Sequence, residues 1–561
     1  MRSKTVSIWV AGTAALAIAA TGCTGSEGGA ASAAKDAAQS PQGAPAPSTP
    51  PRPYDCLPAA AAAAAPGTPV DPAAVYSASS TEPQDLLPGN TGFDRNTNHA
   101  VGMLFRGLVD YDPASGKPVS AMMASCTTTD ARSYTIAVKP GWTFHNGEKV
   151  TAKSYADAWT WALDPANKAA GEEVLAEVDT VKAADEATLL VTLDEADSSF
   201  PAQLGLAAFS PLPSVFFQDP GRFAREPVGN GPFRIDPDAG WRQGVSLTLR
   251  RYDAYAGPDK AQAAGVRLEF GSDAARRGPL DVISLLPAVE PGRTVSVPGG
   301  TVVHQVMSTA EVLYFPMADP AWSAPGAAKV RQGLSLAIDR EAIMRAMYPG
   351  GAWQPATDWL AAGVPGGDNA CGELCAYDPE RARQLVAEGG GVPGGSVTLS
   401  YAQDGGRGRV FKAICDSINT ALGSAVCVPA PVAGLGELRS KVDARQMTGM
   451  FRGGWTADYP SPRNFLDPMF RGDSEANDSG YRNQLFDESV AQARKAADPA
   501  KAAQFWSDAQ AQLAIDMPAL PLWSYGKALA SGPNIANLAA DHFGTPVWTR
   551  IGVKAPAAPR S

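Results

Sequence analysis

Residues 452–459 place a carboxylate between two aromatic side chains, a combination suited to binding a charged amine. Asp458 is the carboxylate, and Trp455 and Tyr459 are the aromatic residues on either side of it. A partly desolvated carboxylate binds an ammonium group more strongly than it binds a neutral donor. The local residues also fit a simple turn from Asp458 into Pro460, because Asp and Pro both favour turns. The segment alone leaves these two interpretations open.

Patterns typical of catalysis are missing from the sequence. It contains no G-x-S-x-G elbow, no Walker-type glycine loop and no H-E-x-x-H motif. The four histidines are His99, His145, His304 and His542. His145 stands inside an F-H-N-G turn, where a structural role is expected, and Asp110 and Asp112 are interpreted as solvated turn residues. The sequence therefore predicts a protein that is not an enzyme, with no catalytic residue, no metal site and no cofactor.

Length and charge restrict the class of protein further. A chain of 561 residues exceeds the usual size of one core, so two or more lobes are expected. The formal net charge is −10, and loss of a leader that contains Arg2 and Lys4 makes it −12. Binding to nucleic acid depends on Lys and Arg that release counterions. We therefore expect no nucleic-acid partner.

The N-terminus has the layout of an export signal followed by a tether. Two basic residues precede an apolar run over residues 6–20, which is shorter than the roughly 20 residues that span a bilayer. Residues 1–22 are thus predicted to be a signal peptide. Cys23, directly after small residues, resembles the lipidated cysteine of bacterial lipoproteins, and simple secretion is the alternative. Residues 23–70 are rich in Gly, Ala, Ser and Pro, which predicts a flexible linker to the lipid anchor.

The six remaining cysteines indicate disulfide bonds, because an even number in an exported chain favours oxidised pairs. They are Cys56, Cys126, Cys371, Cys375, Cys415 and Cys427. Spacing favours Cys371 with Cys375 and Cys415 with Cys427, which leaves Cys56 with Cys126. Sequence alone does not prove any of these pairings. Cys371 and Cys375 could also form half of a metal site, but no histidine nearby completes it.

Three further motifs occur in the order in which a known family carries them. Residues 139–151 read K-P-G-W-T-F-H-N-G-E-K-V-T, a turn between an expected strand and an expected helix. Residues 227–233 read P-V-G-N-G-P-F, and residues 330–341 read V-R-Q-G-L-S-L-A-I-D-R-E. Together with W-T-A-D at 455–458, these motifs resemble the family 5 extracellular solute-binding proteins of ABC importers, of the oligopeptide- and dipeptide-binding lipoprotein type. The resemblance extends over nearly the whole chain after the linker.

The resemblance implies an α/β fold with two lobes, like that of the type II periplasmic binding proteins, in the large peptide-binding subclass with an extra subdomain. The boundaries that it implies are residues 71–111, 225–306 and 528–561 for lobe I with the C-terminal tail, 112–224 for an inserted subdomain II, and 307–527 for lobe II, also called domain III. Hinge strands are expected near residues 305–312 and 523–528. They would let the lobes close over a ligand.

The same resemblance assigns ligand-binding roles to residues 452–459. Asp458 is expected to receive the α-ammonium group of a peptide, and Arg452 to pair with a ligand carboxylate unless it is a solvated surface residue. Trp455 and Tyr459 are expected to line the cleft, although they could also be core residues. The full set of expected ligand-binding residues is Arg452, Gly454, Trp455, Thr456, Asp458 and Tyr459.

The function that the resemblance implies is capture of short peptides outside the cell membrane. A monomeric, lipid-anchored protein on the outer face of a bacterial cell membrane would deliver them to the permease and ATPase subunits of an ABC importer. Proteins of one fold can bind different solutes. Haem, a metal chelate, an opine or a sugar is therefore an alternative cargo. A cell-envelope scaffold or sensor that has lost transport is an alternative of another class.

Overall fold

The computed structural model describes residues 53–60, 67–90, 95–271, 280–285, 296–367, 369–403 and 408–556. The chain divides into two units, Met1–Pro51 and Arg52–Ser561, and the second contains all of the described residues. The signal peptide predicted for residues 1–22, the lipidation predicted at Cys23 and most of the linker lie outside these ranges. They remain predictions of the sequence.

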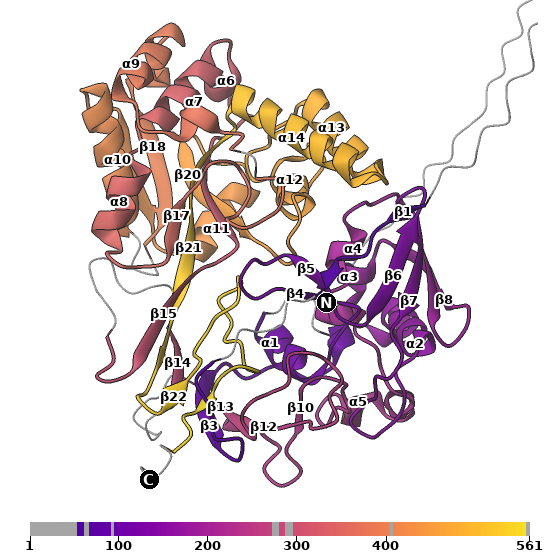
Figure 1. Cartoon of the computed structure of the whole chain (residues 1–561). Coiled ribbons are helices and arrows are strands. Elements are labelled where there is room, and N and C mark those ends of the chain that lie inside the picture. The colour runs from indigo at the N-terminus through magenta and orange to yellow at the C-terminus, as the bar shows by residue number, and fades with distance from the viewer. Residues whose placement is uncertain are drawn as a thin grey trace, which may run out of the picture. The chain divides into compact units, whose positions relative to one another are not determined.

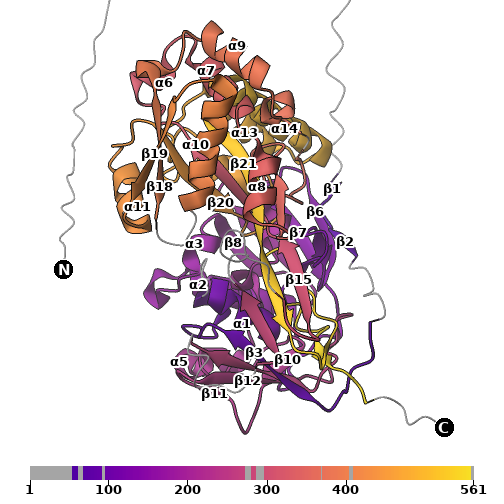
Figure 2. The same cartoon turned by 90° about the vertical axis from the view of Figure 1, so that its left-hand side faces the viewer.

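A 13-stranded sheet forms the framework of the second unit. Its main path is β10 (Phe233–Ile235), β12 (Ser246–Arg251), β13 (Gly265–Phe270), β3 (Val75–Ser80), β14 (Val282–Leu285), β21 (Ala519–Ser531), β16 (Thr309–Tyr314), β20 (Met450–Thr456), β18 (Val397–Ala402) and β19 (Cys427–Val432). Off this path, β11 (Trp241–Arg242) pairs with β12, whereas β15 (Thr301–Val306) and β17 (Trp353–Pro355) pair with β21. One long strand, β21, thus connects the two parts of the sheet (Figures 1 and 2).

The two halves of β21 pair with different strands. Its first half pairs with β16 and β17, and its second half pairs with β14 and β15. One hydrophobic core is built from residues 310–523 and the other from residues 76–282 with Ile535 and Ile551. The sequence suggested lobe boundaries at 306/307 and 527/528. The core of residues 310–523 lies between these two boundaries, and the other core lies outside them. The exact lobe and subdomain boundaries stay a prediction.

Two smaller sheets incorporate the N-terminal part of the described chain. The first has the order β1 (Tyr54–Asp55), β6 (Met123–Thr128), β7 (Ser133–Val138), β9 (Thr188–Leu193) and β8 (Val178–Ala183). The second has the order β2 (Ala59–Ala60), β5 (Pro118–Ser120) and β4 (Val109–Tyr111). A disulfide joins Cys56, which directly follows β1, to Cys126 in β6 of the first sheet. Residues 53–60 therefore belong to the folded unit, which corrects the prediction that a flexible linker extends to residue 70.

Side chains of Asp or Asn cap the first turn of several helices. The helices are α1 (Arg95–Leu104), α2 (Ala152–Leu163), α3 (Glu172–Leu175), α4 (Phe200–Gln203), α5 (Pro220–Phe223), α6 (Pro320–Ser323), α7 (Ala327–Leu336), α8 (Arg340–Met347), α9 (Pro379–Glu388), α10 (Gly408–Leu422), α11 (Leu435–Asp443), α12 (Arg463–Phe470), α13 (Gln484–Lys495) and α14 (Pro499–Asp516). Asp378 and Asp498 cap α9 and α14, and each precedes a proline at the first helical position. A last sheet pairs β22 (Ile535–Ala536) with β23 (Gly552–Val553). Within the described ranges, no helix has the length and apolar character needed to cross a bilayer.

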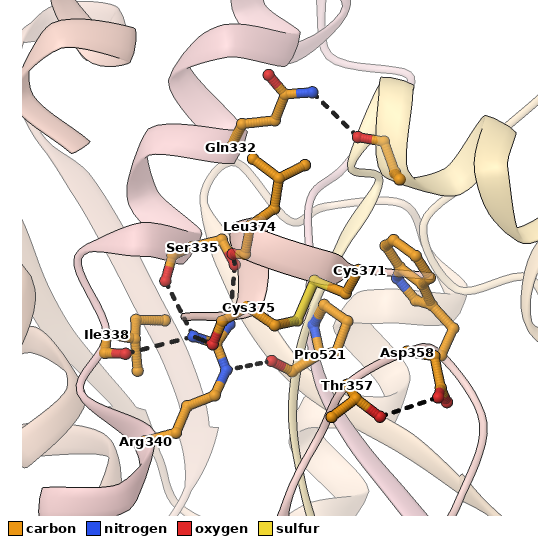
Figure 3. Close-up of a disulfide and its surroundings, with 12 residues drawn as sticks. Gln332, Ser335, Ile338, Arg340, Thr357, Asp358, Cys371, Leu374, Cys375 and Pro521 are labelled. Atoms are coloured by element: carbon orange, nitrogen blue, oxygen red, sulfur yellow. Dashed lines mark hydrogen bonds between the residues drawn. A yellow bond between two sulfur atoms is a disulfide. The ribbon is translucent and has the colours of Figure 1, made fainter. Parts of the chain in front are cut away.

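The arginines of the V-R-Q and I-D-R motif are buried and bind backbone carbonyl oxygens. Arg340 is 3% exposed, and its guanidinium donates to the carbonyl oxygens of Ser335, Cys375 and Pro521 at 2.7–3.1 Å (Figure 3). Burial lowers the pKa of Arg340 to about 9. The disulfide Cys371–Cys375 lies beside this arginine, and Cys415–Cys427 joins α10 to β19. The motif thus ties helices α7 and α8 to strand β21, which explains its place in the fold.

Candidate functional site

The segment after β20 holds Asp458 in a defined turn. The backbone N–H of Asp458 donates to Asn464 Oδ1 at 2.8 Å, and Asn464 Nδ2 donates to Asp458 Oδ2 at 3.3 Å. Asn464 is 7% exposed and belongs to the first turn of α12. These two bonds fix the carboxylate of Asp458 in a half-buried position. The turn predicted from Asp458 and Pro460 is present, and it does not compete with a binding role because the same turn orients the carboxylate.

Asp458 lies in the wall of a cavity of about 310 Å³. Other parts of the wall come from α1, from the segment after it through Pro113, and from residues 541–550. The aromatic and apolar residues of the wall include Met103, Phe105, Tyr111, Trp142, Phe233, Tyr255, Phe543 and Trp548. A volume near 300 Å³ is at the lower end of the range for small-molecule sites, about 300–1,000 Å³. The cavity therefore suits a ligand of a few residues' size.

One side of the cavity is a charged cluster around Arg106. Its guanidinium contacts Asp259 Oδ2 at 2.7 Å through Nη2 and Asp110 Oδ2 at 3.3 Å through Nε. The hydroxyl of Tyr255 donates to the other oxygen of Asp259 at 2.7 Å. Burial raises the pKa of the Asp110 carboxyl, and the positive charge of Arg106 acts in the opposite direction. Two carboxylates on one guanidinium leave this cluster with an excess of negative charge.

A second carboxylate region lies in the segment at residues 541–550. Asp541 accepts hydrogen bonds from the backbone N–H groups of Phe543 and Thr545 at 2.9 and 2.8 Å. Burial raises the pKa of Asp541 to about 6, in spite of these bonds. The carboxylates of the whole cavity wall are Asp110, Asp112, Asp259, Asp458 and Asp541, and its arginines are Arg106 and Arg550. Five carboxylates against two guanidinium groups make the cavity favourable for a cationic group.

The other residues predicted to bind ligand lie in β20, apart from Tyr459 directly after Asp458, and they do not line this cavity. Arg452 Nε donates to Glu311 Oε1 at 2.9 Å, and the side chain of Glu311 is only 4% exposed. In the register of β16 and β20, Glu311 lies opposite Gly454, and Arg452 is its diagonal neighbour on the same face. The positive charge of Arg452 is therefore already compensated within the protein. Its predicted contact with a ligand carboxylate stays a prediction.

Strand packing accounts for Gly454. Its φ is 151°, and a Cβ atom on it would lie 2.2 Å from the carbonyl oxygen of Ala310 on the neighbouring strand. Trp455 and Thr456 are half-buried, and Tyr459 is 7% exposed. The indole N–H of Trp455 is buried without a hydrogen-bond partner among the described residues. The ligand contacts predicted for these four residues also remain predictions.

No sequence pattern pointed to several of the residues that line the cavity. They are Arg106, Asp259, Asp541, His542, Trp548 and Arg550, together with Asp110, which the sequence indicated to be solvated. Asp110 lies in strand β4 and contacts Arg106 in the cavity wall, so its interpretation as a turn residue was wrong, whereas its side chain is 39% exposed. These residues come from three segments separated by more than 100 positions. No local motif joins them, and only tertiary folding brings them together.

Comparison with known proteins places the chain among bacterial binding proteins. Residues 117–477 match the family model described as "Bacterial extracellular solute-binding proteins, family 5 Middle". The chain is 24% identical to the oligopeptide-binding protein OppA of Bacillus subtilis over 494 residues, which cover 81% of this chain and 88% of OppA. It is also similar to the unliganded open form of MppA, a periplasmic murein tripeptide binding protein, with a TM-score of 0.73 and 18% identity over 87% of this chain and 99% of MppA.

A second similar structure contains a ligand that is not a peptide. NikZ of Campylobacter jejuni, in complex with Ni(L-His), matches 86% of this chain and 100% of its own length with a TM-score of 0.62 and 15% identity. The likeness to MppA and NikZ confirms the predicted α/β fold of the periplasmic peptide-binding proteins. It concerns the fold alone and leaves the ligand open.

Proposed function

We propose that this chain, which belongs to the family 5 bacterial extracellular solute-binding proteins, captures short peptides by their free α-ammonium group. As a member of this family it is a binding protein and not an enzyme. The observation that carries the proposal is the position of Asp458 in a small cavity whose wall has five carboxylates and two arginines. An ammonium group gains from several carboxylates in a partly desolvated site.

The proposed mechanism is closure of two lobes over the peptide. Strand β21 runs from one hydrophobic core to the other, and β15 and β16 form a second connection at residues 301–314. These strands are the proposed hinges, at the positions that the sequence suggested near 305–312 and 523–528. Contacts that the ligand makes only in the closed state would supply the free energy of closure. No covalent step on the peptide is part of this mechanism.

The proposal includes export, a lipid anchor at Cys23 and delivery of the peptide to a permease with its ATPase subunits. It rests on the leader sequence and on membership in the family. The anchor would keep the binding protein near the permease on the outer face of the cell membrane. Two or three acyl chains suffice for stable anchoring, whereas one chain binds only marginally.

Isothermal titration with tri-alanine and with N-acetyl-tri-alanine tests the role of Asp458. We expect wild-type protein to bind the free amine and to lose about 100-fold or more in affinity on acetylation, because removal of one partner of a buried charged pair costs about 3–5 kcal/mol. Asp458→Ala and Asp458→Asn should bind the free amine as weakly as wild type binds the acetylated peptide.

The Asn variant separates the two interpretations of Asp458. Asparagine keeps an acceptor for the turn and can still bond with Asn464, but it carries no charge. If Asp458→Asn binds tri-alanine as tightly as wild type, Asp458 only shapes the turn. If wild type binds neither form, the cargo is not a short peptide, and a chelate such as nickel with histidine becomes the first compound to titrate.

A further inference from the structure

We propose that Arg550, assisted by the indole N–H of Trp548, binds the carboxylate group of the ligand in the same cavity. The ligand class is then a zwitterion, with its ammonium group on the carboxylate-rich wall and its carboxylate at Arg550. This inference rests on the proposed function and refines it. It also moves the anion-binding role away from Arg452, to which the sequence assigned it.

Arg452 is unsuited to this role because it already has an acidic partner. Its guanidinium donates to Glu311, whose side chain is 4% exposed. A ligand carboxylate at Arg452 would have to share the guanidinium with this buried carboxylate or displace it. Displacement leaves an uncompensated buried charge, which is strongly unfavourable. The cavity therefore needs a different cation if it is to hold a ligand carboxylate.

The two arginines in the cavity wall differ in their partners. Arg106 contacts both Asp110 and Asp259, so its charge is more than balanced. Within the described residues, the guanidinium of Arg550 forms no ion pair and no side-chain hydrogen bond. Its charge acts on the carboxylate of Asp112, which accepts hydrogen bonds from the N–H and hydroxyl of Ser115 at 2.8 and 2.7 Å. Arg550 is thus a cavity cation whose donors have no partner in the described protein.

The segment that carries Arg550 is held in place by backbone contacts. The N–H of Arg550 donates to the carbonyl oxygen of Val547 at 3.0 Å, and the N–H of Gln262 donates to the carbonyl oxygen of Thr549 at 3.0 Å. The hydroxyl of Tyr76 donates to the carbonyl oxygen of Trp548 at 3.2 Å. A site on a fixed segment loses little conformational entropy when a ligand binds. The side chain of Arg550 therefore extends from a rigid support.

Two neighbouring side chains in the wall carry polar atoms without partners. The indole Nε1 of Trp548 is buried and has no hydrogen-bond partner among the described residues. Both ring nitrogens of His542, a residue that is 6% exposed, are also buried and have no hydrogen-bond partner among the described residues. A buried polar group without a partner is costly, so such groups need an explanation. An acceptor on a ligand beside Arg550 would supply a partner for the indole N–H.

The charges of the cavity also favour a zwitterion over an anion. Five carboxylates in the wall repel a ligand that is only negative, whereas a ligand with a separate ammonium group compensates them. A carboxylate can bind the guanidinium of Arg550 with two parallel hydrogen bonds, the strongest arrangement for this pair. A short peptide or an amino-acid derivative with both charges matches this distribution, and a peptide with a blocked C-terminus does not.

The test compares tri-alanine with tri-alanine amide, by isothermal titration, in wild type and Arg550→Gln. For wild type, amidation should lower the affinity about 10-fold to 100-fold, because hydrogen bonds between charged groups are stronger than neutral ones. For Arg550→Gln, tri-alanine should bind about as weakly as the amide binds to wild type, and amidation should change the affinity by less than about 3-fold. Arg222→Gln removes an exposed arginine that pairs with Glu226 outside the cavity, and it should behave as wild type.

Two further variants keep the test decisive if Arg550→Gln folds poorly. Arg550→Lys retains the charge and should keep most of the amidation effect. Trp548→Phe keeps an aromatic ring, removes the indole N–H and should reduce the effect in part. An amidation effect in Arg550→Gln equal to that in wild type, or none in wild type, overturns the carboxylate site at Arg550. Failure of wild type to bind either peptide instead overturns the proposed function itself, and this inference with it.

Discussion

A buried ion network connects the two hydrophobic cores, and its central residue is Arg463 at the start of α12. The guanidinium of Arg463 is 11% exposed and contacts the carboxylates of Glu177, Asp197 and Asp467. Glu177 and Asp197 come from the part of the chain that builds the core of residues 76–282, whereas Arg463 and Asp467 come from the part that builds the core of residues 310–523. We predict that Arg463→Met lowers the free energy of unfolding substantially. Methionine keeps the apolar stem and removes the charge.

The magnitude follows from what remains after the substitution. Removing one partner of a buried ion pair costs about 3–5 kcal/mol. Asp197, whose side chain is 0% exposed, still accepts hydrogen bonds from Ser199 Oγ and Gln203 Nε2, both at 2.7 Å. Arg494 stays 3.3 Å from Glu177. These contacts compensate part of the loss, so we expect the lower end of the range, about 3 kcal/mol.

Urea unfolding followed by circular dichroism measures this loss, and Arg439→Met provides the matched control. Arg439 also contacts two carboxylates, Asp478 at 2.6 Å and Asp443 at 2.9 Å, but its side chain is 45% exposed. Exposed pairs contribute about 0–1 kcal/mol, so the control should lose less than about 1 kcal/mol. If Arg463→Met costs no more than Arg439→Met, the buried network does not stabilise the contact between the cores.

Two more outcomes follow from the structure and the sequence. Burial raises the pKa of Asp541 to about 6, above its unfolded value of about 4, so the folded state favours the neutral acid. Wild type should therefore lose stability relative to Asp541→Asn as the pH rises from about 4 to about 6. Above pH 6 the difference in stability between the two proteins should stay constant. Thermal melts at several pH values measure this trend, and the opposite trend would contradict the assignment. Mature protein should start at an acylated Cys23 and partition into detergent, and an intact mass without an acyl increment, or membrane association unchanged by Cys23→Ala, would disprove lipidation.

Elements that depend on neighbouring residues were predictable from the sequence. The pairs Asp378-Pro379 and Asp498-Pro499 predict helix starts because the aspartate accepts backbone N–H groups and proline needs no acceptor, and α9 and α14 begin there. The pairing of Cys371 with Cys375 also follows from spacing, since so short a loop keeps the two sulfurs close. The motifs, taken in order, were sufficient to identify the family and with it the fold.

Contacts between distant segments were decided only by the tertiary structure. Strand β1 is a short strand in a segment whose composition predicts a tether. It is ordered because it pairs with β6, and because the next residue, Cys56, forms a disulfide with Cys126. Arg452 has a buried partner because the register of β16 and β20 places Glu311 on its face. A strand's sequence does not specify which strand lies beside it, so this pairing was not predictable.

The cavity that contains Asp458 shows the same division. The sequence singled out Asp458, because a carboxylate between aromatic residues is a local pattern and a known motif covers it. It could not indicate that Asp110, Asp541 and Arg550 share a cavity with Asp458. Apart from Asp541 and Arg550, which belong to one segment, these residues lie about 80 to 440 positions from one another along the chain. The number of charges that face one another across a cavity depends on how the sheet and its loops are packed. That packing, and not any local pattern, decides which group of a ligand each side chain can bind.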